Sequence, residues 1–226
     1  FVDRQTDAHL SGAANPGIHG AADAITDSVT APETDLEGRA RGDEFGAYAY
    51  AASLVFVGEN DGEGDGSAEN PYPSLKAALD AGAREIQVKE GVYSEDGLTV
   101  PAGISLKPYR SDSVTISGAV AFSGAAAVSG IRFAGTVAAD SDAAFSGCTF
   151  EGLLTLSGEN SSVSASFVEA GIVLDSARGG KVVNCLLTGG KTALSLTNSQ
   201  SVSILNNTFY GNDKDLSADA DSTGKV

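Results

Sequence analysis

Five short segments between residues 128 and 212 share one pattern, and this repeat constrains the fold more than any other feature of the chain. Each segment has one apolar residue near its start and a second apolar residue five positions later. The first column is Val128, Phe145, Val163, Val182 and Ile204, and the second is Phe133, Phe150, Val168, Leu187 and Phe209. The second column advances by 17, 18, 19 and 22 residues. That spacing is too short for a helical pair and suits one coil of a strand-and-turn solenoid.

Small and turn-forming residues recur at fixed places in these segments. One column lies between the apolar positions: Gly130, Gly147, Ala165, Asn184 and Asn206. A glycine column follows them: Gly135, Gly152, Gly189 and Gly211. Glycine and asparagine tolerate the left-handed backbone region, so we expect both columns to mark corners. In the third copy Ala170 stands where glycine is expected, and Phe167 competes with Val168 for the inward position.

A second strand with alternating apolar residues follows each copy. The pairs are Val137/Ala139, Leu154/Leu156, Ile172/Leu174 and Leu194/Leu196. Each coil is therefore predicted to run strand, corner, strand, corner around a shared interior. We expect strands at 131–133, 148–150, 185–187 and 207–209 to pair in parallel.

The same architecture is predicted to begin near Ser53. Residues 54–57 are expected to form a strand, and residues 74–81 a helix with Leu75, Ala78 and Leu79 on one face that ends at Gly82. Residues 85–93 are expected to form one long alternating strand with Ile86, Val88 and Val92 as its apolar set. Further strands are indicated by Leu98/Val100, Ile104/Leu106 and Val114/Ile116. The residues after Asn212 are polar and show no recognisable cap.

These motifs, together with the sequence Asn-Pro-Tyr-x-Ser-Leu-x-x-Ala-Leu beginning at Asn70 and Gly91-Val92-Tyr93, resemble the right-handed parallel β-helix proteins of the pectate-lyase type. The resemblance covers roughly residues 53–212. It implies an all-β, right-handed parallel β-helix of five to seven coils, within a domain of residues 53–226, whose first coil is covered by a short N-terminal cap helix near 74–81.

Residues 1–52 lack the repeat but resemble the closing segment that follows many secreted bacterial β-helices. The matching stretches are Phe1-Val2-Asp3, Asp7-Ala8-His9-Leu10, Asn15-Pro16-Gly17-Ile18, Asp35 to Gly42 and Phe45-Gly46-Ala47-Tyr48. His19 and Ala49 depart from that pattern, and the resemblance gives His9 a packing role. Either this segment ends an upstream module of a longer protein, or it caps a neighbouring copy of the same chain. A chain that begins at Phe1 without methionine is expected to be a processed product or an excised fragment.

The charge and cysteine content limit the partners and the chemistry. With 14 basic and 30 acidic residues the formal net charge is −16, which disfavours nucleic acid and anionic membranes as partners. No apolar run reaches the roughly 20 residues that a membrane span requires, so no membrane insertion is expected. Cys148 and Cys185 occupy equivalent positions two copies apart, about 10 Å if coils are about 4.8 Å apart. We therefore expect two free, buried thiols.

Residues 58–66 alternate acidic residues and glycine, in a pattern that resembles the first half of an EF-hand loop. Tyr72 stands where that loop requires a bidentate glutamate, so an EF-hand is excluded. Two interpretations remain open: a looser calcium site, or a flexible solvated loop. The candidate calcium ligands are Glu59, Asp61, Glu63 and Asp65.

The β-helix resemblance also raises polysaccharide cleavage, which needs converging carboxylates. The acids of the repeat region do not recur at one offset: Asp140, Asp142, Glu151, Glu159, Glu169 and Asp175. One mixed-charge group, Asp175, Arg178, Lys181 and Lys191, is interpreted mainly as solvated turn residues, and no catalytic residue is assigned.

The leading hypothesis is therefore a non-enzymatic structural module, extracellular or on the cell surface. We expect it to assemble head to tail with other copies of itself, as in a filament or a surface layer. The alternatives are a fragment of a polysaccharide lyase or hydrolase, and a carbohydrate-binding adhesin module, for which a polysaccharide is the partner.

Overall fold

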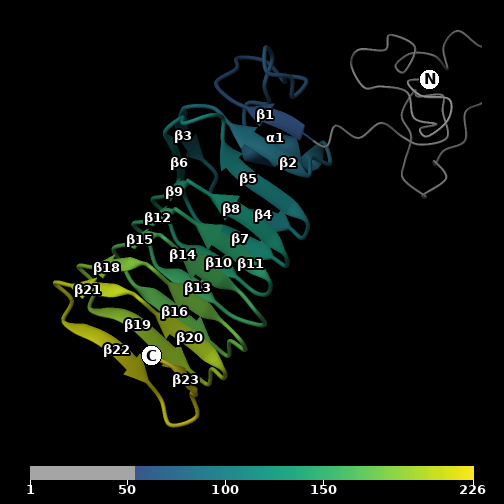
Figure 1. Cartoon of the computed structure of the whole chain (residues 1–226). Helices are drawn as coiled ribbons and strands as arrows, with labels where there is room; N and C mark the ends of the chain where they lie inside the picture. Colours follow the sequence, from purple (N-terminus) through teal and green to yellow (C-terminus); the bar gives the residue numbers. More distant parts are fainter. Residues whose placement is uncertain (1–53) are drawn as a thin grey trace, which may run out of the picture. The chain divides into compact units, whose positions relative to one another are not determined.

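The computed structural model describes residues 54–226, and residues 1–53, with the predicted closing segment and both histidines, lie outside the described residues. The described part is a parallel β-solenoid of about seven turns (Figure 1). Three parallel sheets form its sides, and the chain visits them in turn, so each coil contributes one strand to each sheet. The predicted all-β parallel solenoid is confirmed at this level.

The first sheet has nine strands and contains both the first and the last strand of the described chain. In order they are β1 (Leu54–Val57), β2 (Glu85–Val88), β5 (Ile104–Pro108), β8 (Ala126–Ser129), β11 (Ala143–Ser146), β14 (Ser162–Ser164), β17 (Lys181–Val183), β20 (Val202–Leu205) and β23 (Gly224–Lys225).

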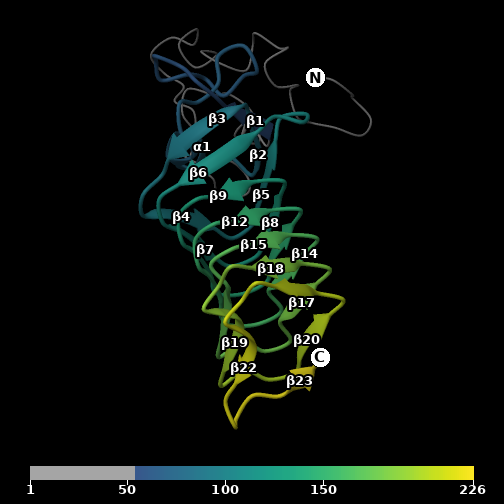
Figure 2. The ribbon, with the colours of Figure 1, turned by 90° about the vertical axis from the view of Figure 1, so that its left-hand side faces the viewer.

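The second sheet has seven strands: β4 (Leu98–Pro101), β7 (Val120–Ser123), β10 (Val137–Ala139), β13 (Leu154–Leu156), β16 (Ile172–Asp175), β19 (Thr192–Thr197) and β22 (Lys214–Ala218). The third sheet also has seven strands: β3 (Gly91–Ser94), β6 (Val114–Ser117), β9 (Arg132–Phe133), β12 (Thr149–Phe150), β15 (Phe167–Val168), β18 (Leu186–Thr188) and β21 (Thr208–Tyr210). Figure 2 shows strands of the third sheet stacked one below the other from β3 to β18.

The register follows the repeat that the sequence predicts. Both predicted apolar columns are aligned coil on coil, so that Phe145 pairs with Val128 and Val163, and Phe150 pairs with Phe133 and Val168. The four strands expected near 131–133, 148–150, 185–187 and 207–209 pair in parallel through β15. The ambiguous third copy also resolves, because Val168 is fully buried while Phe167 is only half-buried.

Four phenylalanines build the densest part of the core. Phe122, Phe133, Phe145 and Phe150 are each 1% exposed or less. The rings of Phe133 and Phe150 stack at 5.4 Å, and the Phe145 ring meets the Phe122 and Phe150 rings edge to face at 5.2 and 5.6 Å. Such pairs add specific contacts to the large apolar area that the rings bury.

Two physical reasons account for the small residues at the corners, a left-handed backbone and crowding between coils, whereas the sequence indicated only the first. The column from Gly130 to Asn206 has positive φ throughout, between 48° and 66°, which confirms its left-handed corner. In the glycine column, Gly189 and Gly211 are also left-handed, but Gly135 and Gly152 are not among the residues with positive φ. A Cβ atom on Gly152 would lie 2.2 Å from the carbonyl oxygen of Gly135. Gly135 and Gly152 do lie at corners between strands of different sheets, as predicted, but crowding between coils requires glycine there rather than a left-handed backbone.

One predicted strand is divided in the structure. The expected strand over 85–93 is two strands, β2 and β3, in different sheets, because the chain turns a corner at Lys89 and Glu90. Consequently Tyr93 is buried while Val92 is 72% exposed, the reverse of the prediction for Val92.

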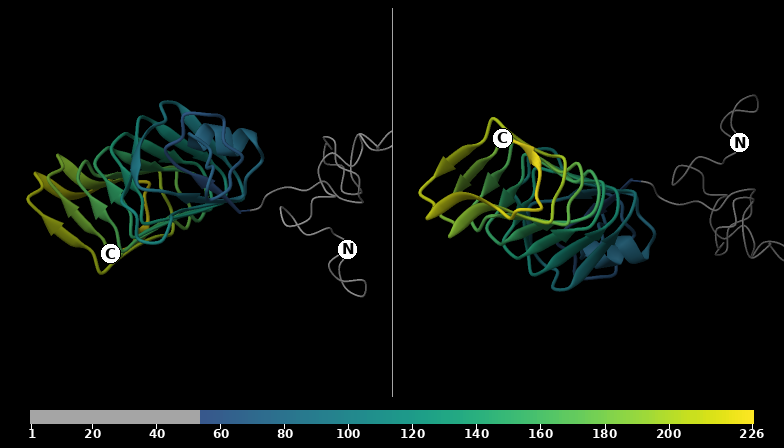
Figure 3. Two further views of the ribbon diagram at one scale, coloured as in Figure 1. Left: turned by 90° about the horizontal axis from the view of Figure 1, so that it is seen from above. Right: turned by 90° about the horizontal axis from the view of Figure 1, so that it is seen from below.

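The end of the solenoid predicted at Asn212 is also wrong. β22 pairs with β19 and β23 pairs with β20, so the polar tail continues the coil. The helix α1 (Leu75–Asp80) lies inside the predicted range 74–81, with Ser74 as its N-cap and Gly82 left-handed after its end. Figure 3 shows the coils from above and from below, with the last coil in yellow.

Candidate functional site

The loop between β1 and α1 carries the four predicted calcium ligands. Glu59, Asp61, Glu63 and Asp65 are all exposed. The Asp65 carboxylate accepts a hydrogen bond from the backbone N–H of Ser67, and bonds with Ser67 hold the pKa of Asp65 below its ordinary value. Within residues 54–226 no three acidic, histidine or cysteine side chains converge as a metal site requires. Calcium binding by this loop stays a prediction.

Asn60 gives this loop its shape. Its side-chain amide donates to the carbonyl oxygen of Pro71 at 2.7 Å, and its Oδ1 accepts from the N–H of Gly62 at 2.9 Å. Backbone bonds between Phe56 and Gly66, and between Gly58 and Tyr72, fold the loop back along β1. The loop therefore forms a fixed wall beside the start of α1.

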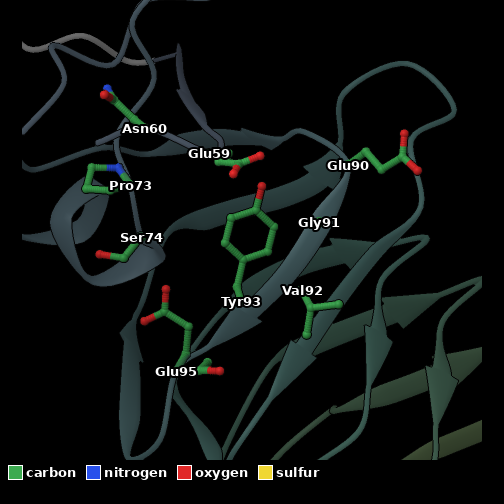
Figure 4. Close-up of a pocket in the computed structure, with 10 residues that line it drawn as sticks. Glu59, Asn60, Pro73, Ser74, Glu90, Gly91, Val92, Tyr93 and Glu95 are labelled. Carbon is green, nitrogen blue, oxygen red and sulfur yellow. The ribbon is translucent and has the colours of Figure 1, made fainter. Parts of the chain in front are cut away.

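A pocket of about 550 Å³ lies between this wall, the start of α1 and the strand β3 (Figure 4). Its ten lining residues include three glutamates and no basic residue: Glu59, Asn60, Pro73, Ser74, Glu90, Gly91, Val92, Tyr93, Ser94 and Glu95. The sequence named the Gly91–Tyr93 motif only as a strand ending. No sequence pattern indicated a role for Glu95, because its carboxylate contacts Leu75, which lies 20 positions earlier in the chain.

Glu95 connects the pocket to α1. Its side chain is buried, and its Oε1 accepts a hydrogen bond of 2.6 Å from the backbone N–H of Leu75, the first residue of the helix. The first N–H groups of a helix have no partner within it, so this carboxylate satisfies one of them. Burial raises the pKa of Glu95, and the bonds from Leu75 and Lys76 offset only part of that rise.

Tyr93 forms the floor of the pocket. Its hydroxyl donates to the carbonyl oxygen of Lys89 at 2.8 Å. Burial raises the pKa of Tyr93, and the negative charges of Asp112 and Glu59 raise it further. Figure 4 shows the Glu59 carboxylate near the hydroxyl end of the Tyr93 ring. A tyrosine with a raised pKa is a poor base at neutral pH, and Glu95 is engaged by the helix. The arrangement therefore suits the binding of a cationic or hydrogen-bond-donating group better than proton transfer.

The mixed-charge group of the sequence is not brought together. Asp175 ends β16 in the second sheet, whereas Lys181 begins β17 in the first sheet. The Arg178 guanidinium donates to the side chain of Gln200 at 2.8 Å, along a corner. None of the ion pairs found within residues 54–226 includes Asp175, Arg178, Lys181 or Lys191.

The acids of the repeat region serve local contacts between coils. Glu151 pairs with Arg132, its neighbour on the adjoining coil. Asp142 accepts a hydrogen bond of 3.1 Å from the side-chain amide of Asn160. These contacts join successive coils at their outer surface and do not form a cleft.

Both cysteines are free and buried, as predicted. Ser166 and Asn207 occupy the positions equivalent to the cysteines in their own coils. Each accepts a hydrogen bond from a backbone N–H group of the preceding coil. Ser166 accepts from the N–H of Cys148 at 3.1 Å, and Asn207 accepts from the N–H of Cys185 at 2.8 Å. Burial raises the pKa of both thiols, so neither has the character of a reactive thiolate.

The last coil differs from the others in its interior. Phe209 and Leu216 continue the inward columns, because they pair with Leu187 and Leu194. Their partners are fully buried, yet Phe209 and Leu216 are only half-buried, and Ala218 is exposed. β21 and β22 are also the end strands of their sheets, so one edge of each has no strand partner within the described residues.

Comparison with known proteins adds no relative. No protein-family model, no curated protein and no solved structure matches the chain.

Within residues 54–226 no helix has the length and apolar character that crossing a membrane requires.

Proposed function

We propose that this chain is a non-enzymatic structural module that assembles head to tail with further copies of itself, outside the cell or on its surface. The proposal includes a right-handed β-helix of the pectate-lyase type, and a capping role for α1 at the first coil. The observation that carries it is the incomplete burial of Phe209 and Leu216 in the last described coil. Strand edges and a slice of apolar core at a solenoid end are a ready surface for another chain.

The first coil supports the proposal by contrast. In β1, Val55 and Val57 are at most 1% exposed, and in α1 Leu75 and Ala78 are equally buried. The two ends of the described solenoid therefore differ in burial: the inward apolar residues are buried at the first coil and only half-buried at the last. Unlike ends favour a heterologous contact over a symmetric one, and a heterologous contact that does not close propagates into a filament.

The proposed occupant of the last coil is the segment 1–52 of an adjacent copy. Its sequence resembles segments that follow the last coil of a β-helix, as described above. Docked on Phe209 and Leu216, it would exclude water from the inward side chains and supply strand partners for β21 and β22. The competing arrangement, in which this segment belongs to an upstream module, predicts no self-association.

Sedimentation velocity over a wide range of protein concentration tests the assembly. We expect the full chain to form species that grow with concentration, and a chain lacking residues 1–52 to stay monomeric. Leu216→Gln should weaken assembly, because it places an amide at the proposed contact. Leu153→Gln is the matched control, since Leu153 is 39% exposed between β12 and β13, and two further coils separate it from the last one. A full chain that remains monomeric at the highest concentration contradicts the proposal.

A further inference from the structure

The strand β3 has a free edge that opens into the pocket. β3 is the end strand of the third sheet and pairs only with β6 among the described residues. Gly91 and Glu95 donate to the β6 side, to the carbonyl oxygens of Ser113 and Ser117. In a parallel ladder alternate residues face opposite neighbours, so the backbone N–H and C=O groups of Val92 and Ser94 point away from β6. Both residues line the pocket, and Val92 is 72% exposed.

The charges around this edge are of one sign. Glu59 lies on the loop after β1 and Glu90 at the corner before β3, and both line the pocket. In Figure 4 the Glu59 carboxylate lies beside Tyr93, whereas the Glu90 side chain extends away from it. Both are exposed, and none of the ion pairs found within residues 54–226 includes either carboxylate. Glu95 is different, since its carboxylate already binds the N–H of Leu75. Two carboxylates are thus free to pair beside a row of unpaired backbone groups.

We propose that the pocket binds an extended peptide segment that adds to the edge of β3 and carries arginine or lysine at alternate positions. The backbone of the peptide would pair with Val92 and Ser94, and its cationic side chains would pair with Glu59 and Glu90. Strand addition of this kind draws affinity from the main chain and specificity from alternate side chains. A cationic segment fits this edge better than an acidic one, because the pocket lining contains three glutamates and no basic residue. The site does not rest on the assembly proposed above.

The binding experiment uses the full chain and fluorescently labelled acetyl-VRVRVR-amide, with fluorescence anisotropy as the readout. We expect saturable binding that weakens as salt rises. Acetyl-VEVEVE-amide should not bind, and a VRVRVR peptide with N-methylated backbone should bind far more weakly because it cannot pair as a strand. Equal binding of the N-methylated peptide would show attraction to acidic surface alone and would overturn the proposal.

Variants of the pocket locate the contact. Glu59→Gln and Glu90→Gln should each weaken binding by about two- to fivefold, the range for exposed ion pairs. Glu69→Gln is the matched control, because Glu69 is exposed in the same loop and does not line the pocket. Val92→Pro should abolish binding, since it removes an N–H that faces the peptide and spares the ladder to β6. Binding that survives Val92→Pro in a folded protein would be incompatible with addition at this edge.

Hydrogen exchange on the unaltered protein provides a check that needs no variant. Saturating peptide should protect the amides of Val92 and Ser94, which face the proposed strand, and leave those of β18 unchanged. Absence of protection at β3 under saturation would refute the site. Sedimentation in the same samples separates this outcome from failure of the assembly, because a monomeric protein can still bind the peptide.

Discussion

At the scale of single residues, the core depends on side chains that repeat at the same place in every coil. Phe150 is fully buried between the rings of Phe133 and Phe145. Phe150→Ala should therefore lower the free energy of unfolding by about 3–5 kcal/mol, as for other buried aromatics. Urea unfolding measures the change, and Thr149→Ala, at the half-buried neighbour on the same strand, is the control. An unchanged unfolding midpoint for Phe150→Ala would contradict the inward position of this column.

Two glycines in one coil separate the two reasons for glycine at a corner. Gly147 has φ of 62° and open space where a Cβ would be, whereas Gly152 would place that atom 2.2 Å from a backbone oxygen. Gly147→Ala should cost about 1–2 kcal/mol, the penalty of the left-handed conformation. Gly152→Ala should cost more, because the backbone of the adjoining coil must move. Gly147→Asn should be tolerated well, since Asn184 and Asn206 occupy the same corner. Equal losses for both alanine variants, measured by urea unfolding, would be inconsistent with this distinction.

The inward columns could be predicted from the sequence, because the apolar residues recur at a regular spacing and are the residues that a core buries. It did not predict the inward side of β3, because Val92 and Tyr93 are both suitable core residues and only the corner at Lys89 decides between them. The crowding at Gly152 could not be predicted either, for a different reason. The crowding depends on how close the carbonyl oxygen of Gly135, on the adjoining coil, comes to Gly152. The residue types of the repeat do not indicate that distance.

At the scale of elements, α1 is held to the solenoid by a carboxylate from β3's end. Glu95→Ala removes the acceptor of the Leu75 N–H and should cost about 1–3 kcal/mol, the range for a buried donor left without a partner. Glu95→Gln keeps an acceptor oxygen and should cost less. If Glu95→Ala leaves the free energy of unfolding unchanged, the bond does not hold α1.

The pKa of Glu95 gives this contact a defined pH dependence. Burial raises this pKa in the folded state, so the folded protein binds the proton more tightly than the unfolded chain. The contribution of Glu95 to stability should therefore fall as pH rises from the ordinary glutamate value through the raised value. The difference in unfolding free energy between the wild type and Glu95→Gln isolates this group, and should move in favour of the glutamine variant as pH increases. A difference that is independent of pH would contradict the raised pKa.

Elements with weak apolar signals were the least predictable from the sequence. β22 contains one inward leucine among polar residues, and its place is fixed by pairing with β19 and by side chains such as Asn212, which donates to the carbonyl oxygen of Leu187. The pocket was missed for a related reason, since its walls come from three elements that are separated in sequence. The loop acids were found easily, yet their spacing alone does not bring their carboxylates together.

At the scale of the whole described solenoid, each inner coil has a neighbour on both sides, and the last coil has one. Stability in stacked repeats is close to a sum of coil and interface contributions, so the last coil should open most easily. Hydrogen exchange should show slow amides in β12 and β15 and faster amides in β21 and β22. Assembly through the last coil would slow the exchange of β21 and β22 as concentration rises, whereas uniform exchange at all coils would contradict the stacked description.

The parallel register has a mechanical consequence. The backbone hydrogen bonds between coils run along the stack, so a force that separates its two ends loads one layer of bonds after another. Successive inward residues of the third sheet lie at positions 133, 150, 168, 187 and 209. Each coil that unwinds would therefore release about 20 residues, or roughly 70 Å of extended chain. A filament of such modules would extend under tension in small, repeated steps as single coils unfold. A domain that unfolds cooperatively would instead lose all of its structure in one event.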